Sequence, residues 1–139
     1  METLRPVPFL GHAEDGVKEW VSSNLGEILP DKIEVLKYLR NNYCIAAVPA
    51  IVRDPFDPER ILRDTRNIIT DGVWVWIQST AYLVEEYDLK LPGEFLTYVR
   101  SIDFRVSKAR ARKQALDMAH PWLEDSRFFW PSHFNDNAG

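Results

Sequence analysis

The feature that most constrains the fold is a pair of apolar, β-like runs on either side of Asp71-Gly72. Residues 67–70 and 73–76 flank this dipeptide and are rich in Val, Ile, Trp and Thr, which fit a pleated surface. A type I′ turn needs a positive φ at both central residues, which Asp tolerates and Gly favours. The sequence therefore predicts a β-hairpin with Asp71 and Gly72 as its two-residue loop.

Helical patterns lie on both sides of this hairpin, and one further short apolar run suits a strand. The run over 43–48 is followed by Pro49, so it is either a central strand or one at an edge. Residues 54–59 contain two prolines and three acids, which is typical of a surface turn. In the helix over 32–40, Ile33, Leu36 and Leu39 recur on one face. The other expected helices begin near residue 15 and span 81–87, 93–102 and 106–119.

These elements predict one α+β domain over residues 1–139, a length that suits a single domain. We expect a small antiparallel sheet of about three strands, with the hairpin at its centre, packed by four to five helices. Residues 1–12 read as an irregular arm, and residues 122–139 as an irregular, aromatic C-terminal tail.

Composition points to a globular protein of the cytoplasm. Hydrophobic residues make up 45% of the chain, and Cys44 is the single cysteine, so no internal disulfide can form. The start of the chain lacks the pattern of a signal peptide, and no apolar run approaches the roughly 18 residues of a membrane span.

The second hairpin run is apolar on both faces. Val73 and Val75 point one way, whereas Trp74 and Trp76 point the other. The favoured interpretation is a sheet buried between helices. The alternative is a partly open Trp face that binds a partner, since Trp is frequent at interface hot spots.

Charge is segregated along the sequence. Residues 71–94 hold five acidic residues and one lysine, and residues 100–113 hold six basic residues and one aspartate. The acids Glu85, Glu86 and Asp88 form a candidate docking patch for a basic partner. The basic segment 100–113 could contact phosphates, but the net charge of −4 argues against nucleic-acid binding. The favoured interpretation of this segment is a solvated helix face or a surface that pairs with acids of the same chain.

The sequence contains no recognisable catalytic, phosphate-binding or metal-binding motif. His12, His120 and His133 have no second ligand at metal-binding spacing, and no glycine-rich phosphate loop or nucleophile elbow occurs. We therefore assign no catalytic residue, metal or cofactor. The competing enzyme hypothesis is a pocket walled by aromatic side chains with carboxylates nearby. Its four walls would be Trp74, Trp76, Tyr82 and Tyr87.

The segments Thr-Asp-Gly-Val-Trp-Val-Trp (70–76), 81–87 and Leu-Pro-Gly-Glu-Phe (91–95) form a combined motif. It resembles a group of small bacterial proteins with a TDGxWxW hairpin and an LPxEF helix start, over residues 45–100. Ile77-Gln78 stands where that pattern has a Pro-containing step. These relatives look like immunity-type accessory proteins encoded beside secreted toxins. The resemblance implies a non-catalytic protein that binds and neutralises a cognate toxin.

The residues expected to contact such a partner combine the acidic patch with neighbouring aromatic side chains. They are Trp74, Trp76, Tyr82, Glu85, Glu86 and Asp88.

Overall fold

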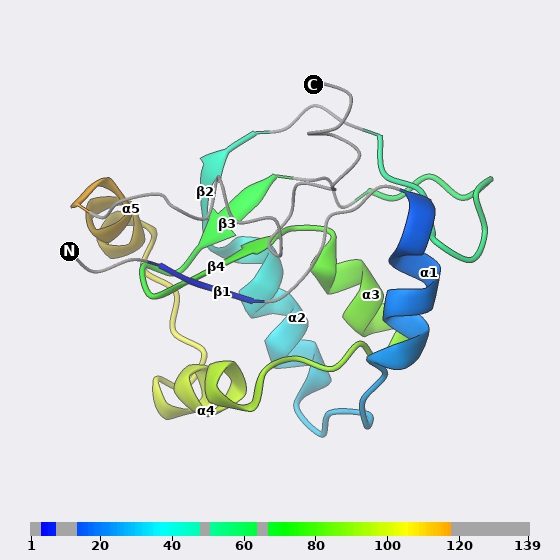
Figure 1. Cartoon of the computed structure of the whole chain (residues 1–139). Helices are drawn as coiled ribbons and strands as arrows, with labels where there is room; N and C mark the ends of the chain where they lie inside the picture. Colours follow the sequence, from blue (N-terminus) through cyan, green and yellow to red (C-terminus); the bar gives the residue numbers. More distant parts are fainter. Residues whose placement is uncertain (1–3, 8–13, 48–50, 64–66, 118–139) are drawn as a thin grey trace.

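Four short strands form one mixed sheet in the order β1-β4-β3-β2, with helices below it and at both sides in the view of Figure 1. The computed structural model describes residues 4–7, 14–47, 51–63 and 67–117, and within them it has five helices, so the predicted α+β class is confirmed. The strands are β1 (Arg5–Pro6), β2 (Tyr43–Ala46), β3 (Ile68–Thr70) and β4 (Trp74–Ile77). The helices are α1 (Glu14–Ser23), α2 (Lys32–Asn41), α3 (Thr80–Tyr87), α4 (Gly93–Ser101) and α5 (Lys108–Asp117).

The β3–β4 hairpin is present, but its turn lies one residue later than predicted. The backbone N–H of Asp71 donates to the carbonyl of Trp74 at 3.3 Å, which makes Gly72 and Val73 the central residues. Of the turn residues only Gly72 has a positive φ, 95°, as at the first position of a type II′ turn. The Asp71 carboxylate accepts the amides of Val73 and Trp74, at 2.9 and 2.7 Å. Asp71 therefore caps the turn from its flank, and the predicted Asp-Gly type I′ loop is wrong.

The sheet gains a fourth strand from the segment predicted to be an irregular arm. Arg5 and Pro6 pair in parallel with Trp74 and Val75, and the Arg5 amide donates to the Val73 carbonyl at 2.8 Å. Pro6 lacks an N–H, which an edge strand tolerates. The expectation of irregular structure over 1–12 is therefore wrong at residues 5–6. The predicted tail, 122–139, lies outside the described residues.

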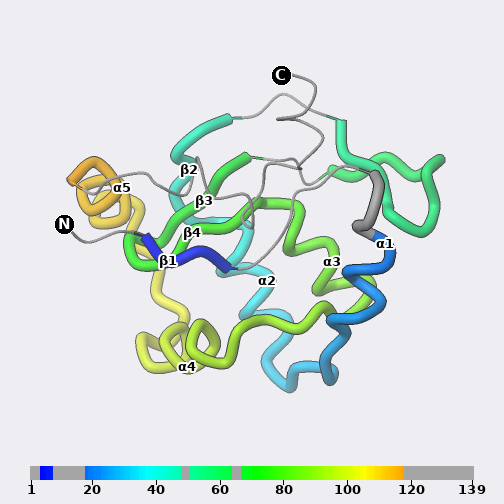
Figure 2. Tube along the Cα trace, viewed as in Figure 1, coloured from blue at the N-terminus to red at the C-terminus, as the bar shows by residue number. Residues whose placement is uncertain are grey.

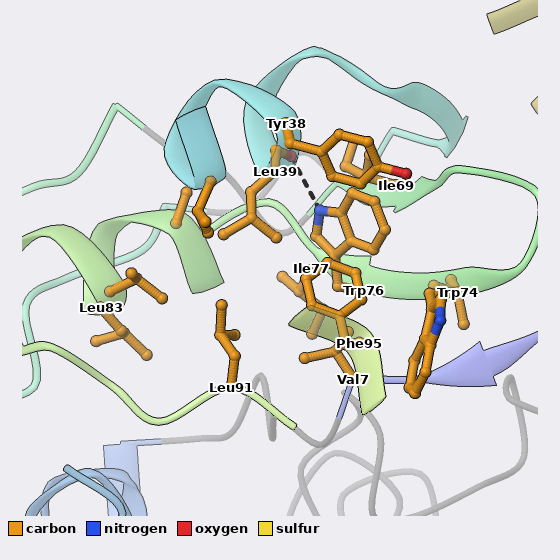
Figure 3. Packing of buried hydrophobic residues seen from close by; sticks show 14 of the residues in the cluster. Val7, Tyr38, Leu39, Ile69, Trp74, Trp76, Ile77, Leu83, Leu91 and Phe95 are labelled. Atoms are coloured by element: carbon orange, nitrogen blue, oxygen red, sulfur yellow. Dashed lines mark hydrogen bonds between the residues drawn. The ribbon is translucent and has the colours of Figure 1, made fainter. Parts of the chain in front are cut away.

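The hairpin is buried on both faces. Trp76 is 0% exposed and lies against Tyr38 of α2 and Phe95 of α4, with ring centroids 6.0 and 5.6 Å away (Figure 3). Its Nε1–H donates to the carbonyl of Leu39 at 2.9 Å. α5 lies beside β2 and β3 near the turn, at the left of the chain trace (Figure 2). The predicted burial of the hairpin is therefore confirmed, with α2 and α4 packed against the face that carries Trp76.

The buried stripe of α2 differs from the predicted one. Val35, Leu36, Tyr38 and Leu39 are buried, whereas Ile33 is 66% exposed. A helix turns by roughly 100° per residue, so the stripe centred between Val35 and Leu39 leaves Ile33 on the opposite side.

Candidate functional site

The two tryptophans named as candidate partner-binding residues, Trp74 and Trp76, lie in the core. Trp74 is 4% exposed, and its ring lies between the guanidinium of Arg5, 4.3 Å away, and the ring of Phe95, 5.5 Å away. β1 therefore closes over Trp74, and α2 and α4 enclose Trp76. The interpretation of a partly open Trp face is wrong, because neither indole presents a surface to a partner.

The three acids of the expected docking patch are each paired within the chain. Glu85 Oε1 lies 3.2 Å from Arg40 Nη2, Glu86 Oε1 lies 3.4 Å from Arg60 Nη2, and Asp88 Oδ1 lies 2.8 Å from Lys32 Nζ. The hydrogen bond from Arg40 outweighs burial and lowers the pKa of Glu85. The patch is therefore a row of balanced ion pairs, and such partly exposed pairs contribute only about 0–1 kcal/mol each.

The connection between β2 and β3 contains a two-stranded ribbon at the outside of the molecule. The Leu62 amide donates to the Val52 carbonyl at 2.9 Å, the Asp54 amide donates to the Arg60 carbonyl at 3.0 Å, and Arg53 pairs with Ile61. We call residues 51–63 the ribbon. It lies on the side of α1 and α3, away from α5 (Figure 1), and its turn occupies the proline-rich segment predicted as a surface excursion.

The ribbon is fastened to α3 by one buried carboxylate. Asp54 is 3% exposed, and it accepts hydrogen bonds from the hydroxyl of Tyr82 and from the hydroxyl of Tyr87, the latter at 2.6 Å. The amides of Phe56 and Asp57 also donate to it, at 2.7 and 3.1 Å. Burial disfavours the charged form, but these four donors outweigh it and hold the pKa of Asp54 below its ordinary value. We call Asp54, Tyr82 and Tyr87 the Asp54 cluster.

The Asp54 cluster suits anchoring better than acid–base chemistry. Burial, followed by the neighbouring Asp54 carboxylate, raises the pKa of both tyrosines, that of Tyr87 to about 12. Both hydroxyls stay protonated at neutral pH, whereas a general base works best with a pKa near the working pH. The Tyr82 and Tyr87 rings are 6.3 Å apart and point to Asp54, while Trp74 packs against Phe95. The predicted four-aromatic pocket is therefore not assembled.

Aromatic and cationic contacts also hold the turn of the ribbon in place. The ring of Phe56 lies 4.7 Å from that of Tyr87, and Lys18 of α1 lies 5.8 Å from the centre of the Phe56 ring. Arg60 lies over Tyr82 at 5.3 Å. The turn therefore contacts both α1 and α3, which fixes the direction in which the ribbon extends.

The outward side of the ribbon carries alternating apolar and cationic residues. Ile51 and Ile61 are 67% and 57% exposed, and Arg53 and Arg63 are exposed beside them. In the register of Arg53 with Ile61, Ile51 lies across from Arg63. We call these four residues the outer face. The sequence gives no periodic signal for this face, because neither Ile-Val-Arg-Asp (51–54) nor Arg-Ile-Leu-Arg (60–63) alternates apolar and polar residues.

The basic segment 100–113 divides into a paired and an unpaired part. Arg100 forms two hydrogen bonds with the carboxylate of Asp31, at 2.8 and 3.0 Å. The cations of α5 are exposed and form no ion pair with a described residue; they are Lys108, Arg110, Arg112 and Lys113. Internal pairing is therefore confirmed for Arg100, and α5 is a solvated basic helix.

The described residues contain neither a metal-binding cluster nor a helix that could span a membrane. Within ranges 4–7, 14–47, 51–63 and 67–117, no group of three or more His, Cys, Asp or Glu side chains is placed to hold a metal ion. None of the helices described there has both the length and the apolar character needed to cross a bilayer.

Comparison with other proteins gave no match: neither a protein-family model, nor a curated protein, nor a solved structure is similar to this chain. The function is therefore inferred from the geometry of the site and from the motif of residues 70–95.

Proposed function

We propose that this chain is a binding protein that recognises another protein through the ribbon. Most concretely, we propose an immunity-type protein that neutralises a cognate bacterial toxin in the cytoplasm. The observation that carries the proposal is a pair of exposed isoleucines, Ile51 and Ile61, on a ribbon anchored by a buried carboxylate.

Anchoring matters because ordering a loop on binding costs about 0.5–1.5 kcal/mol per immobilised side chain. The Asp54 cluster and the backbone bonds of the ribbon fix this segment before a partner arrives. Of the residues predicted to bind a partner, Tyr82 therefore supports the site from beneath.

The ion pairs beside the ribbon suit the rim of an interface. Glu86 pairs with Arg60 of the ribbon, and Glu85 pairs with Arg40 on the neighbouring helix. Interfaces combine an apolar centre with a polar rim, and exposed pairs exchange partners at little cost. Asp88 pairs with Lys32 and belongs to the same row.

The toxin as partner is supported by the resemblance of residues 70–95 to immunity-type accessory proteins.

The test mixes the purified chain with the product of an adjacent toxin-like gene. We expect a complex at micromolar concentrations and protection of cells that express the toxin. Replacing Ile51 and Ile61 with Ser should weaken both effects, whereas Leu116→Ser, at an equally exposed position of α5, should not. No complex and no protection, or equal effects of the two variants, would refute the proposal.

A second candidate function, binding of nucleic acid, is favoured by one observation: the cations of α5 form no ion pair with any residue that the structure describes. Phosphate contacts predict retention on a polyanion resin that falls steeply with salt. Reversing the charge of Arg112 and Lys113 should abolish this retention. Flow-through of the unaltered chain at low salt would exclude this function.

A further inference from the structure

We infer that the outer face of the ribbon binds an acidic protein segment that presents alternating carboxylate and apolar side chains on one face. This inference rests on the proposed protein-binding function and adds the chemistry of the partner. It also reverses the polarity expected from the sequence, in which an acidic patch was to meet a basic partner.

The arrangement of the outer face specifies this pattern. Arg53 lies opposite Ile61, and the same register places Arg63 opposite Ile51. Each apolar side chain is therefore next to a cationic one, both along and across the ribbon. A segment with the complementary alternation would bury both isoleucines and place a carboxylate at each arginine.

The charges of the ribbon also favour an acidic partner. Arg60 is paired with Glu86, whereas Arg53 and Arg63 form no ion pair with any described carboxylate. Arg53 donates to the Pro58 carbonyl at 2.8 Å, which orients its side chain. Asp57 and Glu59 lie in the turn, and the Asp57 carboxylate accepts the Glu59 amide at 3.2 Å. The outer face itself carries two arginines and no carboxylate, so it is positive, although the charge of Arg63 also acts on Glu85 of α3.

The side-chain types distinguish a protein partner from a nucleic acid. Arginine forms bidentate hydrogen bonds with carboxylates as well as with phosphates. Binding to a phosphate backbone is dominated by cations, whereas two exposed isoleucines contribute only when apolar surface covers them. The alternation of both types favours a protein segment.

The test follows amide resonances of the ¹⁵N-labelled full chain during three titrations. Because successive side chains of an extended segment point to opposite faces, the probes repeat every four residues. They are a synthetic peptide of repeated Glu-Ser-Val-Ser, its counterpart of repeated Lys-Ser-Val-Ser, and an oligothymidylate. We expect the acidic peptide to shift the amides of 51–54 and 60–63. Charge reversal with Arg53→Glu and Arg63→Glu should weaken this binding about tenfold or more. The matched reversal on α5, Arg112→Glu with Lys113→Glu, should leave it unchanged.

Three results would overturn the inference. The first is no shift of the ribbon amides at millimolar acidic peptide, and the second is an equal response to the lysine peptide. The third is an unchanged affinity of the Arg53→Glu, Arg63→Glu variant for the acidic peptide, when its other resonances show an intact fold. Shifts of the ribbon by the oligothymidylate alone would assign the face to nucleic acid instead. The proposed function fails separately, when the unaltered chain forms no complex with the adjacent gene product. If that complex forms and Arg53→Glu with Arg63→Glu does not weaken it, the proposed function stands and only the inferred acidic character of the partner is wrong.

Discussion

Replacing Asp54 with Ala tests how the ribbon is held against α3. The change removes a buried carboxylate that accepts from two tyrosine hydroxyls and two backbone amides. Tyr82 is only 5% exposed, so its hydroxyl would lose its partner without full access to water. Leaving such a group unsatisfied costs about 1–3 kcal/mol, and each lost bond to a charged acceptor contributes about 1.5–3 kcal/mol. Relief from burying the charge offsets part of this sum, so we expect a loss of about 3 kcal/mol in unfolding free energy.

Urea denaturation measures the global loss, and hydrogen exchange locates it. Exchange should accelerate most in the ribbon amides that the backbone bonds protect, those of Asp54 and Leu62. The matched control is Asp57→Ala in the same turn, which removes one exposed hydrogen bond from the Glu59 amide and should cost about 0.5 kcal/mol. If Asp54→Ala costs no more than this control, or if ribbon exchange is unchanged, the reasoning is refuted.

Acid provides an independent measurement of the same anchor. The pKa of Asp54 is lowered in the folded state, so its contribution is fully present above the unfolded value of 3.8. It is lost as pH falls through the lower, folded pKa. The unaltered chain should therefore lose stability over this acid range, and Asp54→Ala should show a correspondingly smaller loss. Equal acid dependence of the two proteins would exclude Asp54 as the group responsible.

Three further changes test the hairpin. Gly72→Ala places a side chain at a φ of 95°, with its Cβ against the end of Gln114 and 3.2 Å from Ala111 Cα, so we expect a loss of about 2 kcal/mol in thermal or urea unfolding. A neutral result would contradict the assigned turn. Trp76→Phe removes the bond to the Leu39 carbonyl and leaves a cavity, for a cost of about 3 kcal/mol by denaturation, and a loss below 1 kcal/mol would count against the packing described. Burial raises the pKa of Asp71, so its protonated form favours the folded state and stability falls as pH rises from 3.8 through the folded pKa. Asp71→Asn keeps an acceptor for the turn amides and should flatten that fall in a pH series of unfolding curves; an unchanged slope would exclude Asp71.

The fold class and the hairpin could be predicted because their signals are local. Alternating Val, Ile and Trp around Asp71-Gly72 specify two strands, whatever surrounds them. The turn register could not be predicted in the same way. It depends on whether Asp71 is a central residue of the loop or flanks the loop. Here it flanks the loop, and its carboxylate accepts hydrogen bonds from the amides of Val73 and Trp74.

The candidate site was harder to predict because long-range partners define it. Asp54 meets Tyr82 and Tyr87 across a sequence separation of 28 and 33 residues, and no local pattern encodes that encounter. The burial of Trp74 likewise depends on β1, where two residues carry no periodicity. The exposure of Ile51 and Ile61 depends on the pairing of two runs in which the apolar residues stand side by side, so no alternation in the sequence indicates it.

The parallel pairing of β1 with β4 has a consequence for synthesis of the chain. Arg5 leaves the ribosome long before its partner Trp74 exists, by a delay on the order of seconds at ordinary elongation rates. Throughout that interval Leu4 and Val7, both buried in the finished protein, have no strand on which to dock. The hairpin, by contrast, can close as soon as its second strand emerges. β1 is therefore made before β3 and yet waits far longer for its partner strand.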